Sequence, residues 1–531
     1  METEDRNLTD RRVRRFWILL AAMTLLRLAL AGRAGLGVDE SHYLVYSRHP
    51  AWGYFDHPPG VLLAALPLRL AGESHFTARL GPIVLAALTL VAWRSWALKN
   101  ASPEAAWRGT VFLHLLPLYH LLSLALMPDA VLNLFWCLAL LCFSRALKAE
   151  GPGWWLAAGG AGGLAALGKY HGLLLVPCLL GYLASSRRYR SQLRRAGPYL
   201  AGLAGAAVFL PNVIWNWRHD WISYRFQLGH GIGGGWSFTF NRFLAALGGQ
   251  LGVASPIVFG LLAAATAVLL RKKKKSEGEL LVLWTSLPVF AFFILAGSGG
   301  KILPHWTFPG WWAGALAAGG VLAARLADPR TARRWRGWYR AGAGLALFMV
   351  AGMYAGMAFP ILPPLYNAAR AASSALNRIV PAVEPLDPFD HNLDITNDLY
   401  GWPEAAARVE EIRAEMESPG RTFVFAHRPF TASQLAAELP PRTAVTTLHP
   451  RPDQYLLWFD PAEHSGWDAL FVDHDRYGRD YETYLPLFAG GDPEPVVFTV
   501  YRGSRPAHVF RVFRYYDFRG FRPGRGTPPP L

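Results

Sequence analysis

Residues 243–298 read FLAALGGQLGVASPIVFGLLAAATAVLLRKKKKSEGELLVLWTSLPVFAFFILAGS. Two long apolar runs flank a short basic segment from Arg271 to Lys275. A membrane-spanning helix needs about 20 mainly apolar residues, and Lys and Arg gather in the cytoplasmic loops between spans. This stretch therefore predicts a helical membrane protein with the basic segment on the inner side.

The same alternation continues over most of the chain. Apolar runs separated by short loops extend from Trp17 to Pro360, and hydrophobic residues make up 52% of the 531 residues. Charged residues make up 17%, against about 25% in a soluble domain. The three cysteines lie inside apolar runs, which is typical of small core residues and predicts no disulfide framework.

The formal net charge of +16 comes from short basic clusters that lie between the apolar runs. No soluble basic face remains to carry a nucleic acid, so no nucleic-acid partner is expected. The clusters instead mark cytoplasmic loops. They are Arg11-Arg12 with Arg14-Arg15, Arg187-Arg188, Arg194-Arg195, Arg271 to Lys275, and Arg333-Arg334.

With the N-terminus in the cytoplasm, these loops fit a multi-pass protein of the inner (plasma) membrane with about eleven spans. The run from Trp17 is expected to be retained as the first span, because no small-residue cleavage site follows it. An odd number of spans places the C-terminus outside. The predicted spans are residues 15–36, 79–98, 107–126, 130–147, 154–169, 171–186, 197–216, 243–270, 280–298, 305–326 and 338–360.

The character of the chain changes after Pro360. Short alternating apolar runs at 422–426 and 469–472 predict strands, and the spacing over 403–417 predicts a helix. We expect residues 1–360 to form the transmembrane domain. Residues 361–531 are expected to form a small extracytoplasmic α/β domain on the periplasmic side, with a disordered tail after Phe518.

The first outer loop contains the most informative polar residues. It holds GVDESHY at 37–43 and GYFDHPP at 53–59. Adjacent carboxylates beside a membrane span need a reason, and one is catalysis, in which a carboxylate accepts a proton from a hydroxyl or binds a cation. For Asp39-Glu40 alone, a solvated acidic loop is the simpler interpretation. For Asp56-His57 alone, the simpler interpretation is a turn.

Other polar motifs fall on the same outer side in the predicted topology. Each alone is readily explained as a helix cap or an interfacial anchor. Together, acids and bases at so many outer loop ends predict one site. These motifs are Arg79 at the start of the second span, MPDA at 127–130, GKYHG at 168–172, NWRHDW at 216–221 and KILPHW at 301–306.

The ordered set resembles the lipid-linked glycosyltransferases of fold type C. More narrowly, it resembles the branch shared by the protein O-mannosyltransferases and the lipid A aminoarabinose transferase. The resemblance covers about residues 10–360 and extends weakly to the outer domain. It implies a polytopic GT-C-like helical fold, and it rests on Asp39-Glu40-x-x-Tyr43, residues 53–59, Met127-Pro-Asp129, Gly168-Lys-Tyr170, Trp215-Asn-x-x-His219-Asp-Trp221 and His305-Trp306.

Members of this family take a sugar from a polyprenyl phosphate, such as undecaprenyl phosphate, and pass it to an acceptor outside the membrane. The resemblance implies that Asp39 is the base for the acceptor hydroxyl, and that Glu40 orients it or helps to bind the acceptor. It implies that Asp129 assists, as a second acid or a cation ligand. The other implied substrate-binding residues are Tyr43, Asp56, His57, Arg79, Lys169, Tyr170, His219 and His305, of which Lys169, Arg79, His57 and His305 are candidates for the phosphate.

The sequence leaves the acceptor and the metal open. The expected acceptor is lipid A or lipopolysaccharide, another envelope glycan, or a protein. Membrane lipid is expected to surround the protein. A direct displacement would invert the anomeric centre. A divalent cation at Asp39 and Asp129 is compatible with the residues but not required by them, and no other cofactor is expected.

Two other functions fit a polytopic protein with an outer domain. A transporter or flippase for a lipid-linked sugar needs the same groove, but it predicts polar residues through the bundle to the inner side. The predicted spans hold few of these, with His114 and His120 as exceptions. A non-catalytic envelope scaffold would leave the outer-loop acids unexplained.

Overall fold

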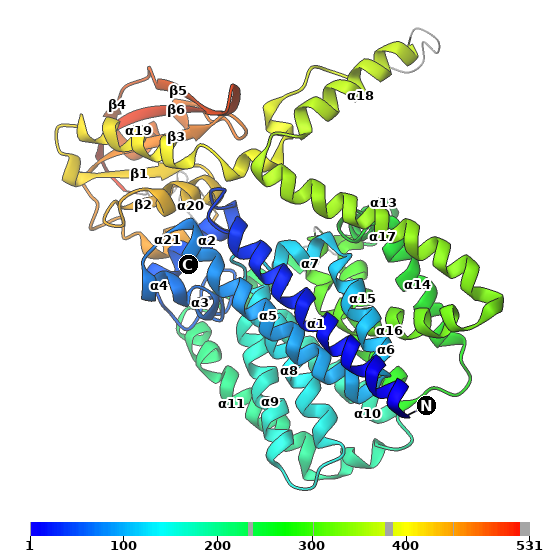
Figure 1. Cartoon of the computed structure of the whole chain (residues 1–531). Helices are drawn as coiled ribbons and strands as arrows, with labels where there is room; N and C mark the ends of the chain where they lie inside the picture. Colours follow the sequence, from blue (N-terminus) through cyan, green and yellow to red (C-terminus); the bar gives the residue numbers. More distant parts are fainter. Residues whose placement is uncertain (1, 232–236, 301, 378–385, 450, 521–531) are drawn as a thin grey trace. The chain divides into compact units, whose positions relative to one another are not determined.

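The computed structural model describes residues 2–231, 237–300, 302–377, 386–449 and 451–520, and the chain divides into two units (Figure 1). Unit 1 consists of Met1–Ala31, Pro50–Gly72 and Phe76–Ala351. Unit 2 consists of Gly32–His49, Glu73–His75 and Gly352–Leu531. The tail predicted after Phe518 lies, from residue 521, outside the described residues.

The apolar runs of the sequence form the helices of unit 1. These are α1 (Glu2–Leu30), α3 (Val61–Ala64), α4 (Leu66–Ala71), α5 (His75–Asn100), α6 (Pro103–His114), α7 (Pro117–Leu122), α8 (Asp129–Ala146), α9 (Gly153–Gly168), α10 (Leu175–Ser185), α11 (Ala196–Arg218), α12 (Ile222–Gly231), α13 (Phe240–Ala254), α14 (Pro256–Arg271), α15 (Glu277–Gly299), α16 (Phe308–Ala327) and α17 (Pro329–Ala358). Short 3₁₀ turns lie at η1 (Tyr170–Leu174), η2 (Arg190–Arg194) and η3 (Pro304–Thr307).

Several of these helices are long and apolar enough to cross a membrane, as expected of a multi-pass protein. Among the described residues, five helices pass this test: α5, α8, α11, α15 and α17. The number rises to six if the bent pair α13 and α14 counts as one span. The predicted number of eleven spans is therefore not confirmed.

Two runs predicted as continuous spans are interrupted by proline. The run 243–270 bends by 109° between α13 and α14, where Ser255 has a φ of 71° and precedes Pro256. The run 107–126 is divided between α6 and α7, which starts at Pro117. Proline lacks the N–H of the helix ladder and disfavours helical geometry in the residue before it, so both breaks follow from the sequence.

Small residues allow the helices of unit 1 to pack closely around large aromatic rings. A Cβ on Gly319 of α16 would lie 2.4 Å from the carbonyl oxygen of Ala105 on α6, so only glycine fits this contact. The Trp312 indole N–H donates to Asn133 Oδ1 at 2.9 Å, and Trp93 donates to the Trp312 carbonyl at 2.7 Å. These two buried indoles thus keep hydrogen bonds inside the apolar core.

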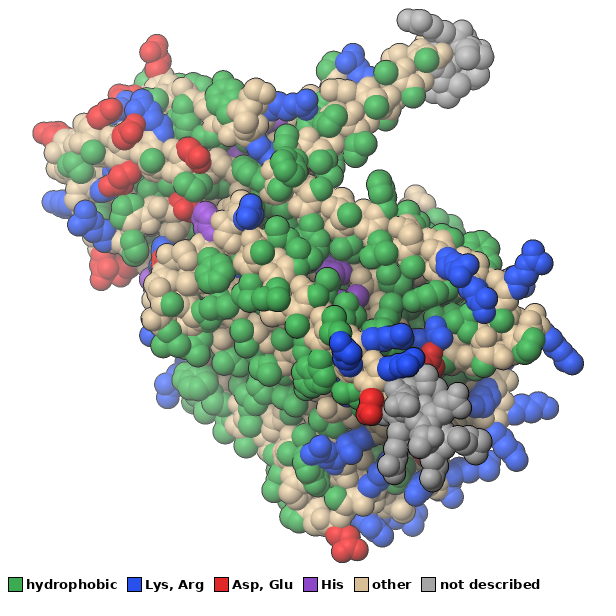
Figure 2. All heavy atoms as spheres, in the orientation of Figure 1, with side chains coloured by type: hydrophobic (Ala, Val, Ile, Leu, Met, Phe, Trp, Pro, Cys, Tyr) green, Lys and Arg blue, Asp and Glu red, His purple; other side chains and the backbone are tan. Residues whose placement is uncertain are grey.

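Figure 2 shows that apolar side chains cover much of the helical surface, while Lys and Arg gather around the end of unit 1 where α1 begins. Large exposed apolar residues on these helices include Trp17, Leu25, Val84 and Leu88. A soluble protein rarely exposes so much apolar surface, whereas lipid tails cover it favourably. The surface is that of a membrane protein.

The interior of unit 1 also contains a buried cation. Arg27, in the last turn of α1, is 1% exposed, and its guanidinium lies 5.1 Å from the centre of the Tyr119 ring. Its Nε and Nη2 atoms have no hydrogen-bond partner among the described residues. A buried cation with two unpartnered nitrogens opposes folding, because the cost of its desolvation exceeds the stabilisation from the neighbouring tyrosine.

We therefore expect Arg27→Met to stabilise the protein by about 1–4 kcal/mol. Thermal unfolding in detergent would measure this, with Arg94→Met as the matched control. Arg94 also lies over an aromatic ring, Phe16 at 4.8 Å, but it is only half-buried. A clear loss of stability in Arg27→Met alone would show that the guanidinium has a favourable partner.

Unit 2 is built on a mixed sheet of six strands, which confirms the small C-terminal sheet domain. Strands β2, β1 and β3 are parallel, and the long strand β6 pairs antiparallel with β3, β4 and β5. The predicted strand at 422–426 is β1, and the run 469–472 lies inside β3. The strands are β1 (Thr422–Ala426), β2 (Val445–Thr447), β3 (Asp468–His474), β4 (Phe488–Gly491), β5 (Val496–Arg502) and β6 (Arg505–Phe518).

Unit 2 also contains several helices. They are α2 (Val38–Arg48), α18 (Leu362–Asn377), α19 (Trp402–Ala414), α20 (Pro429–Glu438) and α21 (Gln454–Trp458). The 3₁₀ turns are η4 (His391–Leu393), η5 (Ile395–Leu399), η6 (Pro419–Arg421), η7 (Tyr481–Thr483) and η8 (Leu485–Leu487). Helix α2 belongs to this unit although its sequence lies near the start of the chain.

Candidate active site

A buried ion pair lies at the centre of the candidate site in unit 1. Asp129 begins α8, and Lys169 directly follows α9. The Lys169 ammonium lies 2.9 Å from Asp129 Oδ2, and both side chains are almost fully buried. Gly168 makes this approach possible, because a Cβ there would lie 2.7 Å from the Leu132 amide nitrogen of α8. The pair is thus fixed by the packing of α8 against α9.

Three histidines surround this pair. His305 of η3 and His57 of the loop before α3 interact electrostatically with Asp129. His171 of η1 interacts with Lys169, His305 and His57, and its ring packs on Phe293 with centroids 4.6 Å apart. Asp129 Oδ1 and His171 Nδ1 are buried without a hydrogen-bond partner among the described residues. Unpaired buried polar atoms in one place are typical of a site for a polar ligand.

His171 was not among the predicted site residues. It lies in the GKYHG motif directly after Lys169 and Tyr170, so the signal was present in the sequence. The motif alone does not tell which of its side chains face inward, because the chain leaves α9 for a 3₁₀ turn there.

The loop that carries Asp56 and His57 is held by α12. Gln227 donates from Nε2 to the Asp56 carbonyl at 2.6 Å, and Asp56 Oδ2 lies 3.1 Å from His57 Nδ1. The Tyr170 ring packs against Tyr224 of the same helix, with centroids 5.5 Å apart. These contacts bring Asp56, His57 and Tyr170 into one region of unit 1.

Two predicted site residues make contacts of another kind. Arg79 is buried and donates from Nη1 to the Ala31 carbonyl at 2.8 Å, which fastens the chain just after α1. His219 donates from Nδ1 to the Trp215 carbonyl at 2.8 Å and stacks on the Trp215 indole at 4.0 Å. Their substrate-binding roles stay predictions.

The acidic pair Asp39-Glu40 lies in unit 2, in the first turn of α2. Glu40 is buried, and its Oε2 accepts a hydrogen bond from the Gly37 backbone N–H at 2.9 Å. That contact caps the helix, so Glu40 has a structural role beside its predicted one. Asp39 is exposed, and Tyr43 is buried one turn later.

Helix α2 is fixed by α20 of the same unit. Ser41 Oγ donates to Gln434 Oε1 at 2.6 Å, and Gln434 Nε2 donates to the Leu36 carbonyl at 3.1 Å. His42 Nδ1 lies 3.1 Å from Ser433 Oγ. The C-terminal part of the chain therefore determines where the predicted base Asp39 points.

The sequence leaves a divalent cation open, and the surroundings of Asp129 in unit 1 do not favour one. Asp129 is compensated by the Lys169 ammonium, which would repel a second cation. Its carboxylate and the surrounding histidine atoms are not among the described groups whose ligand atoms converge closely enough for a metal ion. We therefore derive no step through a cation.

Comparisons with known proteins show what the chain is similar to. Residues 56–215 match the family described as dolichyl-phosphate-mannose-protein mannosyltransferase. The lipid A galacturonosyltransferase RgtD of Rhizobium johnstonii is 29% identical over 290 residues, which are 53% of this chain and 59% of RgtD. The chain thus spans about three fifths of the length of this curated relative.

Solved structures give the fold. The crystal structure of ArnT from Cupriavidus metallidurans in the apo state superimposes with a TM-score of 0.62 at 18% identity, covering 94% of this chain and 98% of ArnT. The chain has the fold of the type C glycosyltransferases. The archaeal oligosaccharyltransferase AglB from Archaeoglobus fulgidus gives a TM-score of 0.50 at 11% identity, covering 87% of this chain and 69% of AglB. The type C fold expected from the sequence is confirmed.

Proposed function

We propose that this type C fold protein is a membrane glycosyltransferase. It takes a sugar from a polyprenyl phosphate, such as undecaprenyl phosphate, and passes it to an envelope acceptor. The observation that carries the proposal is the buried Asp129–Lys169 pair beside His57, His171 and His305, with Asp129 Oδ1 left without a partner among the described residues. A buried site with one ammonium and three imidazoles suits a phosphate leaving group.

The chemistry is a direct displacement. The acceptor oxygen forms a bond to the anomeric carbon while the bond from that carbon to the phosphate oxygen breaks. The electron pair leaves with the polyprenyl phosphate, a stable anion that needs no strong general acid. In this proposal Asp39 takes the proton of the acceptor hydroxyl, Lys169 and the histidines hold the phosphate, and the anomeric centre inverts.

A cavity beside η3 supports the proposal that the prenyl chain lies there. It has a volume of about 490 Å³ and is lined by Arg242, Ala245, Ala246, Gly297, Gly300, Ile302 and Pro304. Its last lining residue directly precedes His305. An apolar cavity with a single arginine, next to a histidine of the site, suits an isoprenoid chain ending in a phosphate.

Filling this cavity should weaken donor binding. We expect Ala245→Phe to raise the KM for the polyprenyl-phosphate sugar by about tenfold, which corresponds to about 1.4 kcal/mol. Steady-state kinetics in detergent would measure this. Ala264→Phe on α14 is the matched control, because Ala264 is exposed and does not line the cavity. Equal KM values for the two variants would place the prenyl chain elsewhere.

The curated relative suggests which substrates to test first. RgtD is named for galacturonosyl transfer to lipid A. We therefore propose to test lipid A first as the acceptor. A galacturonosyl polyprenyl phosphate is the first donor to test. Another glycan or a protein remains the alternative acceptor.

We propose the orientation predicted from the sequence. The protein lies in the inner membrane with its N-terminus in the cytoplasm and residues 361–531 on the periplasmic side. The gathering of Lys and Arg where α1 begins supports this orientation, because cytoplasmic loops are rich in these residues (Figure 2).

A lipid-linked sugar transporter without transfer chemistry is the second candidate. The buried Arg27, His114 and His120 favour it, because polar groups inside a bundle are expected along a transport path. His120 Nε2 donates to the His114 carbonyl at 3.0 Å, however, so these histidines also have a structural contact.

One experiment separates the two candidates. Purified protein in liposomes would be incubated with radiolabelled polyprenyl-phosphate sugars and lipid A, lipopolysaccharide or protein acceptors. Transfer of label to an acceptor is expected. Movement of the labelled lipid across the bilayer, with neither transfer nor hydrolysis for any donor, would instead identify a transporter.

A further inference from the structure

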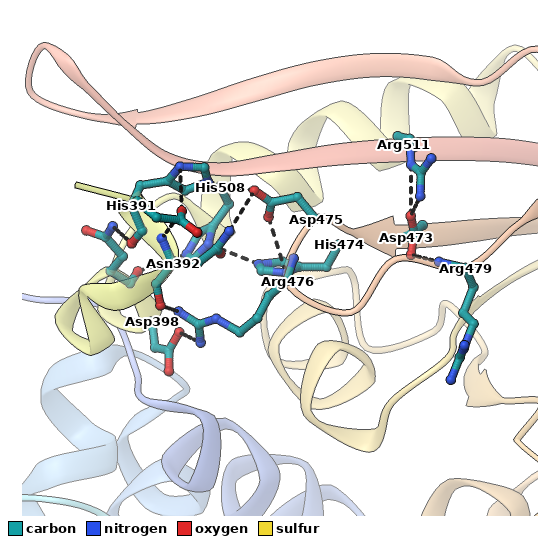
Figure 3. Close-up of polar contacts among 12 residues, drawn as sticks. His391, Asn392, Asp398, Asp473, His474, Asp475, Arg476, Arg479, His508 and Arg511 are labelled. Carbon is teal, nitrogen blue, oxygen red and sulfur yellow. Dashed lines mark hydrogen bonds and ion pairs between the residues drawn. The ribbon is translucent and has the colours of Figure 1, made fainter. Parts of the chain in front are cut away.

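A cluster of histidine and carboxylate groups lies in unit 2, outside the proposed transfer chemistry (Figure 3). His474 ends β3, Asp475 follows it, and His508 lies on β6. One ligand atom from each of the three lies within 4.8 Å of the others. We name these three residues the His-Asp cluster.

The two imidazoles of the cluster face each other. His474 Nε2 lies 3.0 Å from His508 Nδ1, and the two rings are buried. Two nitrogen ligands on a tetrahedral zinc ion are about 3.3 Å apart when each Zn–N distance is about 2.05 Å. A metal ion therefore fits between these atoms after a small shift of one ring.

The hydrogen bonds of His508 already orient it as a ligand. Its Nε2 lies 2.9 Å from the Asn397 carbonyl, which can only accept, so the proton is on Nε2 and the Nδ1 lone pair faces His474. Metal-bound histidines typically donate their other N–H to a carbonyl or a carboxylate.

His474 needs one proton to move. The Arg476 backbone N–H donates to its Nδ1 at 3.1 Å, so without metal the ring carries its proton on Nε2, between the two imidazoles. A metal ion takes the place of that proton. That proton moves to Nδ1, which ends the hydrogen bond from the Arg476 N–H and makes Asp475 Oδ1, 3.4 Å away, the acceptor for Nδ1; the ring stays neutral.

The third group is also oriented. His391 donates from Nε2 to Asp475 Oδ2 at 2.6 Å, and Asp475 Oδ1 is buried without a hydrogen-bond partner among the described residues. The nearby cation Arg476 is compensated by Asp398 at 2.7 Å, so the cluster keeps one uncompensated negative charge. Two imidazoles, one carboxylate and an outer histidine form a donor set that zinc prefers.

We propose that His474, His508 and Asp475 bind a zinc ion that joins β3 to β6 in the outer unit. His391 positions the carboxylate of Asp475 from outside the ligand set. All the residues of this site belong to unit 2 and none takes part in the proposed sugar transfer. The zinc proposal is therefore independent of the proposed function.

The test uses the full-length protein in detergent, stripped with a chelator and then titrated with Co²⁺ or Zn²⁺. Wild type is expected to show visible d–d bands of tetrahedral cobalt that one equivalent of zinc removes, and elemental analysis should find one zinc per chain after dialysis. Absence of the bands in wild type would overturn the proposal without recourse to any variant.

Variants then assign the ligands. His474→Gln and His508→Gln are expected to bind zinc about 100-fold more weakly, and Asp475→Asn about tenfold more weakly. His449→Gln is the matched control, because His449 also packs against a second histidine, His427, but outside the cluster. Equal zinc content in wild type, His474→Gln and His508→Gln would show adventitious binding only.

Discussion

Replacing Asp39 by Asn should lower the rate of sugar transfer by about 100- to 10,000-fold, the usual contribution of a general base. The amide cannot take the proton of the acceptor hydroxyl, whereas it keeps the size of the side chain. The expected loss is in kcat, with little change in the KM for the donor, since the proposed donor contacts are made by other residues. Single-turnover transfer of radiolabelled sugar would measure it.

The control for this variant is another acid in the first turn of a helix. Glu404 lies in the first turn of α19 in the same unit and is exposed, as Asp39 is in α2. Glu404→Gln should leave transfer unchanged. Undiminished transfer by Asp39→Asn would refute the assignment of the base, although the protein could still be a transferase.

The variant Glu40→Gln distinguishes a structural role of Glu40 from a chemical one. Its carboxylate caps α2 through the Gly37 N–H, and glutamine can accept the same hydrogen bond. If Glu40 only supports the helix, Glu40→Gln leaves the rate close to that of wild type. A large loss of rate in Glu40→Gln would instead show that the charge of Glu40 takes part in the chemistry.

The residues of unit 1 show how much of the candidate site can be predicted from the sequence. The predicted topology placed Asp129, Lys169, His57 and His305 on one side of the membrane, and the structure brings these four into one group. Their proximity follows because each residue lies near the end of an apolar run, and the ends of neighbouring helices meet at one face. The sequence did not reveal that Asp129 and Lys169 form a buried pair, since that depends on the close packing permitted by Gly168.

The position of α2 could not be predicted. Its partners Ser433 and Gln434 lie almost 400 residues away along the chain, and no local pattern encodes such a contact. By contrast, the helix breaks before Pro117 and Pro256 follow from local sequence, because proline interrupts a helix. The predicted number of eleven spans is not confirmed, and at these two places a long apolar run contains a residue that interrupts the helix.

Breaking the buried Asp129–Lys169 pair is expected to have a large effect on both stability and transfer. Lys169→Met should destabilise the protein by about 3–5 kcal/mol, because it leaves the carboxylate of Asp129 buried without its counterion. Both side chains are almost completely buried, so solvent does not replace the lost interaction. Thermal or denaturant unfolding in detergent would measure the change, and transfer should fall below detection, since the proposed phosphate ligand is gone.

A double variant decides whether the pair is structural or functional. In Asp129→Asn/Lys169→Met no uncompensated charge remains, so most of the lost stability should return. Transfer should not return, because the donor phosphate still lacks its ammonium. Recovery of both stability and transfer would show that the pair only holds α8 against α9. Recovery of stability alone, with a raised KM for the donor in the milder Lys169→Arg variant, would assign Lys169 to the phosphate. The two roles differ physically: the packing of α8 against α9 needs only that no unpaired charge is buried between them, whereas an anionic leaving group needs a positive charge where the phosphate departs.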